Sequence, residues 1–179
     1  MKICIYGASN NKINKVYLDG AFELGKIIGE RGHGIVFGGG QNGMMGACAR
    51  GVHENGGSIL GIAPKFFDLP GVLYEDCTNF IFTETMSERK HLLETNSDAF
   101  VILPGGNGTM DEFFETYTLK TLGILGKPIV IFNINGYYDP LLEMIKKSDK
   151  EGFLRPNSLE LFRTFTDPLE MIEYLENDI

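Results

Sequence analysis

The chain has 179 residues, the length of one domain, and can bury roughly 70% of the surface that its unfolded state exposes. Hydrophobic residues make up 43% and charged residues 22%, as in ordinary soluble globular proteins, and the formal net charge is −8. This acidic balance, without any run of Lys or Arg, argues against nucleic acid as a partner, so an anionic ligand would be held by local donors.

Cysteine spacing and hydropathy argue against a metal-binding, secreted or membrane-spanning protein. Cys4, Cys48 and Cys77 have neither metal-ligand nor CxxC spacing, so the sequence predicts no metal site. Strand-like sequence follows Met1 directly, without a signal peptide, and no apolar run approaches the ~20 residues that cross a membrane. We therefore expect a cytoplasmic protein with no membrane partner.

Short apolar runs alternate with longer amphipathic ones along the chain. The apolar runs predict strands at residues 2–6, 34–37, 58–62, 80–82, 99–103 and 128–132. Helical periodicity predicts helices at about 14–30, 44–54, 87–95, 108–122, 140–150 and 167–175, the last with Asp167 as its N-cap. Residues 64–78 have no clear period and read as an irregular excursion.

Apolar strands that alternate with helices are typical of a parallel sheet covered on both faces. The sequence thus predicts an α/β fold, a Rossmann-like doubly wound parallel sheet with helices on both faces, in a single domain over 1–179. Such sheets bind ligands at the carboxyl ends of their strands, near a topological switch point. Glycine clusters at 38–46 and 105–108 both follow predicted strands, which places the expected site there.

The run Pro104 to Glu112, PGGNGTMDE, is the strongest motif. Its glycines let backbone N–H groups approach a ligand, and the helix that begins behind them adds unpaired donors that favour phosphate. Glu112 lies one turn after Thr109, where a carboxylate would repel phosphate, which suggests chemistry on a phosphorylated molecule. A capping box of Thr109 and Glu112 is the structural alternative, but it leaves the preceding glycines unexplained.

Two other elements lie at predicted strand ends. The 38–46 cluster stands between a strand and a helix, as a phosphate loop does, but lacks the Lys-Ser/Thr of a P-loop, and tight packing without a ligand explains it equally well.

Arg89 and Lys90 start a helix, where adjacent cations are usually a solvated face. Arg89 nevertheless offers a bidentate fork for an oxyanion or a purine edge, and Lys90 a point charge.

In this order, the Gly-Gly-Gly…Gly-Met-Met-Gly loop (38–46), Met-x-x-Arg-Lys (86–90) and Pro-Gly-Gly-x-Gly-Thr-x-x-Glu (104–112) resemble the Lonely Guy (LOG) family of phosphoribohydrolases. These enzymes activate cytokinins and are often mislabelled as lysine decarboxylases. The resemblance covers nearly the whole chain and implies a homodimer, no cofactor, and hydrolysis of a nucleoside 5′-monophosphate to free base and ribose 5-phosphate. Nothing in the chain looks like a pyridoxal-phosphate lysine site.

The resemblance also implies roles for particular residues. The family's catalytic arginine and glutamate fall on Arg89 and Glu112. Its substrate-binding positions fall on Lys90, Gly106, Asn107, Gly108, Thr109, Met110, Asp111 and Thr118. We add Gly40 and Gly43 of the first loop, and Glu115, which shares a helix face with Glu112 and is a candidate for holding ribose hydroxyls. Asp111 is expected to point elsewhere, into solvent, and Thr118 to lie near the pocket edge.

Some questions stay open at this stage. Where the family has a Pro-Arg/Lys-Glu stretch, Pro64-Lys65 is followed here by two phenylalanines, which leaves the base-binding wall undefined. An isoprenoid side chain on adenine needs an apolar pocket, which Phe66, Phe67, Met86 or Met110 could line, but plain AMP remains open. The alternative function is a non-catalytic Rossmann-like nucleotide sensor or molybdenum cofactor carrier, which needs the donors but not the Arg89–Glu112 pair.

Overall fold

The computed structural model describes residues 1–178. Its strands are β1 Lys2–Tyr6, β2 Gly34–Phe37, β3 Ile59–Pro64, β4 Asn79–Thr83, β5 Ala99–Ile102, β6 Ile129–Phe132 and β7 Arg163–Phe165. Its α-helices are α1 Lys15–Glu30, α2 Gly43–Glu54, α3 Met86–Thr95, α4 Asn107–Thr121, α5 Asp139–Lys150 and α6 Pro168–Asp178. Short 3-10 turns lie at Lys65–Phe67 (η1), Ile134–Gly136 (η2) and Ser158–Glu160 (η3).

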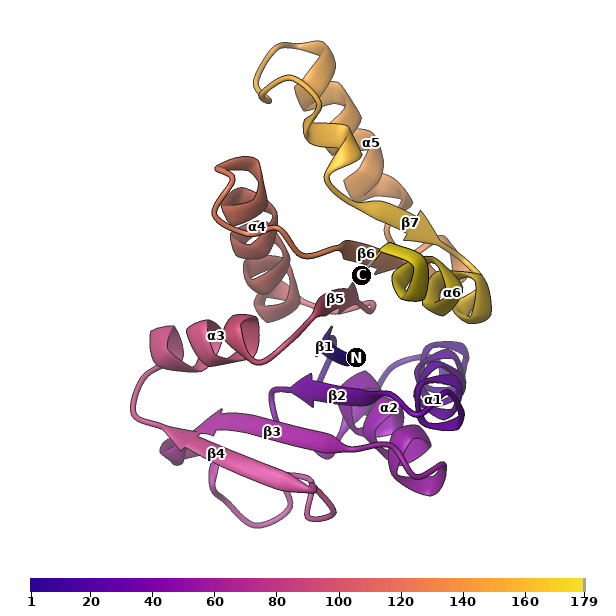
Figure 1. Ribbon diagram of the computed structural model, residues 1–179, viewed down its shortest axis with the longest axis vertical. Coiled ribbons are helices and arrows are strands. Elements are labelled where there is room, and N and C mark those ends of the chain that lie inside the picture. The colour runs from indigo at the N-terminus through magenta and orange to yellow at the C-terminus, as the bar shows by residue number, and fades with distance from the viewer. Residues whose placement is uncertain (179) are drawn as a thin grey trace.

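The strands form one sheet in the order β4-β3-β2-β1-β5-β6-β7, and every neighbouring pair is parallel (Figure 1). From β1 the chain moves outward through β2 and β3 to β4, and then returns to add β5 on the other side of β1. The topological switch point therefore lies between β1 and β5, where open α/β sheets bind ligands. The predicted Rossmann-like α/β fold is confirmed.

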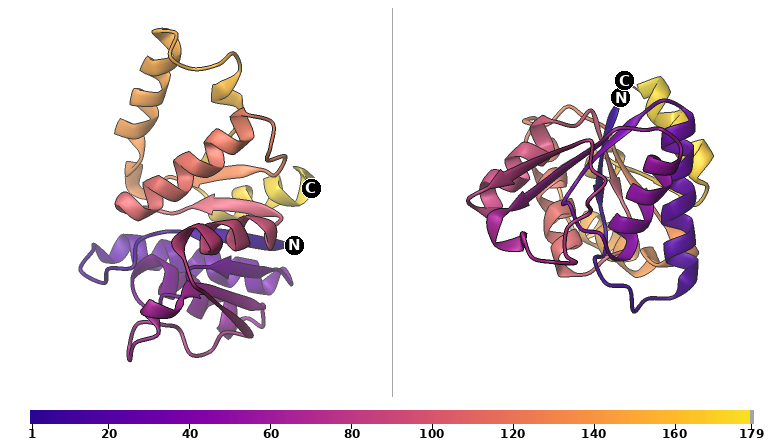
Figure 2. Two further views of the ribbon diagram at one scale, coloured as in Figure 1. Left: turned by 90° about the vertical axis from the view of Figure 1, so that its left-hand side faces the viewer. Right: turned by 90° about the horizontal axis from the view of Figure 1, so that it is seen from below.

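Helices cover both faces of this sheet, with α1, α2 and α6 on one side and α3 and α4 on the other (Figures 1 and 2). Successive side chains of β1 point to opposite faces of the sheet and so contribute to the core on both sides. Ile3 and Ile5 pack into the core beneath α1, α2 and α6, whereas Cys4 and Tyr6 face the core beneath α3 and α4. All four side chains are buried, as expected for a central strand of a parallel sheet.

The predicted strands and helices all form, with ends displaced by only a few residues. Asp167 caps the last helix, since its Oδ1 accepts from the N–H groups of Leu169 and Glu170 at 2.9 Å each. The three-residue strand β7 was not predicted because it is short, lies at the sheet edge and is largely exposed, so it has no apolar run. No helix of residues 1–178 is long and apolar enough to span a bilayer.

Two segments differ from what the sequence suggested. Helix α4 begins at Asn107 with Gly106 as its N-cap and no side-chain cap bond, so Thr109 is the third helical residue and the capping box, the structural alternative for this motif, does not form. The excursion after β3 is less irregular than expected. It begins with η1, and Leu73 forms an antiparallel bridge with Gly40, which fastens the segment to the first glycine loop.

Candidate active site

A cavity of about 500 Å³ opens at the carboxyl ends of β1, β2 and β5, next to the switch point. Five segments line it: the loop after β1, the 38–45 loop, the excursion after β3, the start of α3 and the start of α4. The lining residues are Gly7, Ala8, Ser9, Asn10, Gly38, Gly40, Asn42, Met45, Phe67, Val72, Leu73, Met86, Arg89, Gly106, Gly108, Thr109, Asp111 and Glu112.

The N-terminus of α4 brings free donors to this cavity. Helix geometry leaves the N–H groups of Asn107, Gly108 and Thr109 without an intrahelical acceptor. Within residues 1–178, no side chain or carbonyl accepts from them either, since the first bonded N–H of the helix is that of Met110, to the Gly106 carbonyl. Three unpaired donors and the positive end of the helix dipole form a site that favours an anion.

The N-terminus of α2, behind the first glycine cluster, is already occupied. The Gly43 N–H donates to Asn11 Oδ1 (2.6 Å), and the N–H groups of Met44 and Met45 donate to the Ala8 carbonyl (2.8 and 3.3 Å). Gly43 has φ +63°, and a Cβ there would overlap the same carbonyl. Packing therefore explains this part of the cluster, and Gly43 does not line the cavity, although Gly40 does.

Arg89 and Glu112 meet on the cavity wall. Arg89 Nη1 donates to Glu112 Oε1 across 2.7 Å, and only 9% and 10% of the two side chains are exposed. The solvated-face interpretation is wrong for Arg89, because its side chain is buried against Gly38 of the first glycine loop. A Cβ on Gly38 would overlap the guanidinium, so a larger residue there would force the Arg89 side chain to shift. Arg89 Nε is the one fully buried side-chain donor or acceptor in the described chain that has no hydrogen-bond partner.

The buried position of Glu112 determines its protonation behaviour. Burial raises the pKa of the Glu112 carboxyl above its usual value of 4.5, against the opposing effect of the Arg89 charge and hydrogen bond. A carboxylate in this setting can accept a proton near the reacting atoms, or stabilise positive charge there.

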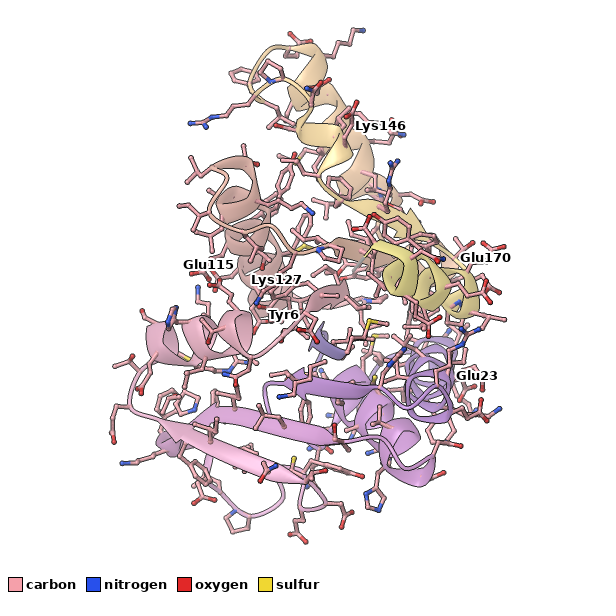
Figure 3. The ribbon with its side chains drawn as sticks, viewed as in Figure 1. Tyr6, Glu23, Glu115, Lys127, Lys146 and Glu170 are labelled. Atoms are coloured by element: carbon pink, nitrogen blue, oxygen red, sulfur yellow. The ribbon has the colours of Figure 1, made fainter. Side chains whose placement is uncertain are left out.

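Lys90 has a different environment from its neighbour. Its Nζ lies 2.6 Å from Glu115 Oε2 and 2.9 Å from Asp111 Oδ2, and the hydrogen bond with Glu115 is the largest contribution that raises the pKa of Lys90. Glu115 projects from α4 toward α3 (Figure 3) and does not line the cavity. Asp111 is exposed as expected, but it pairs with Lys90 and contributes to the cavity wall.

The structure brings together Arg89, Glu112, Gly40, Gly106, Gly108, Thr109 and Asp111 of the predicted site. It leaves the following predicted residues off the cavity wall: Lys90, Asn107, Met110, Glu115, Thr118 and Gly43. Thr118 is exposed near the far end of α4, and its neighbour Thr116 is the buried one. Sequence reasoning missed Ser9 and Asn10, although their place directly after the first strand was the available signal.

One wall of the cavity is apolar. Phe67, Val72 and Leu73 come from the excursion after β3, Met45 from α2 and Met86 from α3. Phe67 and Met86 were two of the predicted candidates for this wall and lie on it, whereas Phe66 and Met110 do not. The excursion thus supplies the wall that the sequence left undefined.

Fold and site together define a Rossmann-like α/β protein with a ligand cavity at its switch point. The solved structures that it resembles include the molybdenum cofactor binding protein from Rippkaea orientalis, with a TM-score of 0.76 at 20% identity, which covers 98% of this chain and 95% of that one. The Moco carrier protein from Chlamydomonas reinhardtii has a TM-score of 0.74 at 24% identity, with 99% and 96% covered. At these identities the likeness concerns the fold.

Sequence comparison gives the family. A family profile described as "Possible lysine decarboxylase" matches residues 45–175. The chain is 37% identical to the probable cytokinin riboside 5′-monophosphate phosphoribohydrolase LOGL2 of Oryza sativa subsp. japonica, over 98% of this chain and 72% of that protein. It is 34% identical to cytokinin riboside 5′-monophosphate phosphoribohydrolase LOG5 of Arabidopsis thaliana, over 98% and 77%. The chain belongs to the Lonely Guy (LOG) family.

Proposed function

We propose that this protein hydrolyses the N-glycosidic bond of a purine nucleoside 5′-monophosphate and releases the free base and ribose 5-phosphate. The names of its relatives support this reaction. The observation that carries it is the buried Arg89–Glu112 ion pair, which lies on the same cavity wall as the free N–H groups of α4. A protein that only holds an anion needs the donors but gains nothing from a carboxylate beside them.

The 5′-phosphate is assigned to the start of α4. The N–H groups of residues 106–109 supply donors from fixed backbone positions, and the Thr109 side chain adds a hydroxyl. Such a site does not depend on the charge of the whole molecule, which is consistent with a net charge of −8. The first glycine cluster, whose helix N–H groups are bonded to the loop after β1, instead supports Arg89 and the wall near the base.

Glu112 is assigned to the anomeric carbon. Cleavage of the C1′–N bond places positive charge on the ribose ring, while the bonding electrons leave with the purine. A carboxylate next to C1′ stabilises that charge and accepts a proton from the attacking water. Arg89 holds Glu112 ionised, and its guanidinium on the cavity wall is assigned to a substrate acceptor, either the departing base or an oxygen of the ribose phosphate.

The apolar wall favours a base with an apolar substituent. Phe67, Val72, Leu73, Met45 and Met86 would enclose an alkyl group, such as the isoprenoid chain of a cytokinin, better than the polar edge of unmodified adenine. AMP remains a second substrate to be tested, because nothing in the wall blocks a smaller base.

Lysine decarboxylation does not fit this site. A lysine that forms a Schiff base must lose its proton easily, so its pKa has to be low. The pKa of Lys90 is raised by its pairing with Glu115 and Asp111. The carrier alternative draws on the fold likeness to molybdenum cofactor proteins, but such a role leaves the Arg89–Glu112 pair without a purpose.

A homodimer is also part of the proposal. Tyr117 is buried in its own chain, whereas Leu122 and Ile124, just beyond α4, are 48% and 70% exposed. An apolar pair of this kind at the end of a helix is suited to contact with a second copy. Light scattering after size exclusion would give the mass, and a monomer at micromolar concentration would contradict this part of the proposal.

The test of the reaction is base release from AMP and from isopentenyladenosine 5′-monophosphate, followed by chromatography, with ribose 5-phosphate measured as the second product. We expect equimolar base and sugar phosphate, with isopentenyladenosine monophosphate turned over faster. The corresponding nucleosides, which lack the phosphate, are the control and should react far more slowly. No release from either nucleotide, with nucleotide or cofactor still bound tightly, would favour the carrier or sensor function.

A further inference from the structure

The turn that precedes α4 has all three of its carbonyl oxygens bonded. The Leu103 carbonyl accepts from the Tyr138 hydroxyl (2.7 Å), and the Pro104 carbonyl accepts from the Ala8 N–H (3.1 Å). The Gly105 carbonyl accepts from the Tyr137 hydroxyl (2.7 Å). These bonds come from outside the turn, and the two tyrosines lie side by side in the segment that joins η2 to α5.

The bond at Gly105 has a consequence for the next residue. In a trans peptide the C=O of one residue and the N–H of the next point in opposite directions. The Gly106 N–H therefore points away from the Tyr137 hydroxyl, which does not line the cavity. Gly106 does line the cavity, and no atom of residues 1–178 accepts from its N–H.

A peptide between two glycines is unusually free to rotate. Neither Gly105 nor Gly106 has a Cβ that would disfavour the flipped orientation. A flipped Gly105–Gly106 peptide would direct a carbonyl oxygen at the anion and remove one donor. Something must therefore hold this peptide, and the Tyr137 hydroxyl is the group bonded to it.

The ring of Tyr137 is itself fixed by its neighbours. Tyr17 of α1 contacts it edge-on, with ring centroids 5.9 Å apart at 78°, and Tyr138 packs against it at 5.0 Å and 83°. Such aromatic pairs restrict the side-chain rotamer. The hydroxyl is thus held in place from two sides, even though 40% of Tyr137 is exposed.

We propose that Tyr137 is a positioning residue, whose hydroxyl holds the Gly105–Gly106 peptide in the orientation that presents the Gly106 N–H to the 5′-phosphate. This inference rests on the proposed function, since it assigns the phosphate to the start of α4. It extends the site to a side chain that does not touch the substrate, and it makes affinity for the phosphate, rather than the chemical step, the property that depends on Tyr137.

Tyr138 provides a matched control. Its hydroxyl also donates to a carbonyl of the turn, but that carbonyl, of Leu103, is joined to Pro104, which has no N–H to orient. Tyr138 is 1% exposed and belongs to the core beneath α4. Its hydroxyl therefore stabilises the fold without directing any donor.

The experiment compares Tyr137→Phe and Tyr138→Phe by calorimetric titration with ribose 5-phosphate and with free adenine, alongside steady-state kinetics on the nucleotide. We expect Tyr137→Phe to weaken ribose 5-phosphate binding and raise KM by about tenfold, the value of a lost charge-assisted hydrogen bond. Adenine affinity, kcat and the melting temperature should stay near wild type. For Tyr138→Phe we expect a lower melting temperature with unchanged affinity for both ligands.

Three negative results have different meanings. If wild type binds ribose 5-phosphate and Tyr137→Phe binds it equally well, the positioning role is wrong while the proposed function stands. If wild type binds no phosphorylated ligand, the proposed function itself fails. A loss of adenine and ribose 5-phosphate affinity in equal measure in Tyr137→Phe would indicate general disorder of the site, and would also overturn the inference.

Discussion

Arg89 makes one bond to Glu112 and leaves another donor unused. Its Nη1 lies 2.7 Å from Glu112 Oε1, while its Nε is fully buried and has no acceptor in residues 1–178. A buried donor without a partner costs about 1–3 kcal/mol, so the protein is less stable for keeping it. The cost accompanies the ion pair with Glu112 and the close contact with Gly38, which together hold the guanidinium on the cavity wall.

Substitution of Glu112 tests the carboxylate. We expect Glu112→Gln to lower kcat by ~10²-fold or more, the magnitude of a lost general acid–base group. The amide keeps the shape of the side chain and can still accept from Arg89, so the circular dichroism spectrum should be unchanged. Base release under saturating nucleotide gives kcat directly.

Glu115→Gln is the matched control for that measurement. Glu115 lies one turn further along α4 but bonds to Lys90 outside the cavity wall, so we expect kcat within about threefold of wild type, as for removal of a partly exposed ion pair. Equal losses in both variants would mean that the substrate reaches Glu115. Near-normal turnover in Glu112→Gln would contradict the assignment of Glu112.

The pKa of Glu112 predicts the acid limb of the pH profile. Burial raises this pKa above 4.5, and the reaction uses the carboxylate, so kcat/KM should fall as pH decreases through a value higher than that of an exposed glutamate. A profile that stays flat down to pH ~4, the region of an unperturbed glutamate, would exclude Glu112 as the essential base.

The same shift has a consequence for stability. Because the folded-state pKa of Glu112 is raised, its contribution to stability is fully present below the unfolded pKa and is lost as pH rises through the folded pKa. The free energy of unfolding of wild type, minus that of Glu112→Gln, should therefore decrease as pH rises from the unfolded pKa of Glu112 to its folded pKa. Urea denaturation at several pH values measures this difference in unfolding free energy. If the difference increases with pH, the folded state lowers the pKa of Glu112 and our assignment of a raised pKa is wrong.

The two glycine loops show what sequence could and could not establish. Position at strand ends and glycine content indicated both as sites, and the architecture followed from alternating apolar and amphipathic runs. The difference between the loops lies in hydrogen bonds from a distant segment: Ala8 and Asn11 occupy the donors of α2, while no residue of 1–178 occupies the first three donors of α4. Such pairing depends on tertiary structure, and no local pattern encodes it.

The side chains of α3 and α4 illustrate the same limit. The spacing predicted that Glu112 and Glu115 share one face of α4, and both do pair with α3. Glu112 pairs with Arg89 on the cavity wall, whereas Glu115 pairs with Lys90 outside it. Arg89 and Lys90 are adjacent in sequence and project at different angles, so one pairs inside the cavity and the other outside it. The choice between a buried and a solvated Arg89 required the tertiary contact of its guanidinium with Gly38 of the first glycine loop.

Glycine substitutions separate packing from binding. Gly43→Ala should destabilise the protein by about 1–3 kcal/mol or more, because φ is +63° and the added Cβ meets the Ala8 carbonyl. Gly108 has no atom within 4 Å of an added Cβ and no positive φ, so Gly108→Ala should leave stability unchanged or slightly raised while it increases KM by narrowing the cavity. Thermal denaturation and nucleotide kinetics distinguish the two. Unchanged stability in Gly43→Ala would refute the packing explanation of the first loop.

The apolar wall predicts which substitution changes base preference. Phe67 lines the cavity, so Phe67→Ala should reduce kcat/KM for isopentenyladenosine monophosphate by about tenfold more than for AMP, as expected when a phenyl contact with an alkyl group is lost. Phe66 is the control, because it is adjacent and 57% exposed but does not line the cavity. Its ring packs against that of Phe67, with centroids 4.7 Å apart. Phe66→Ala should leave the ratio of the two rates unchanged. If both variants lower kcat/KM equally for the two nucleotides, the two phenylalanines only support the conformation of the excursion after β3 and do not contact the base substituent. Selection of an apolar base must then come from Met45, Met86 or the other lining residues.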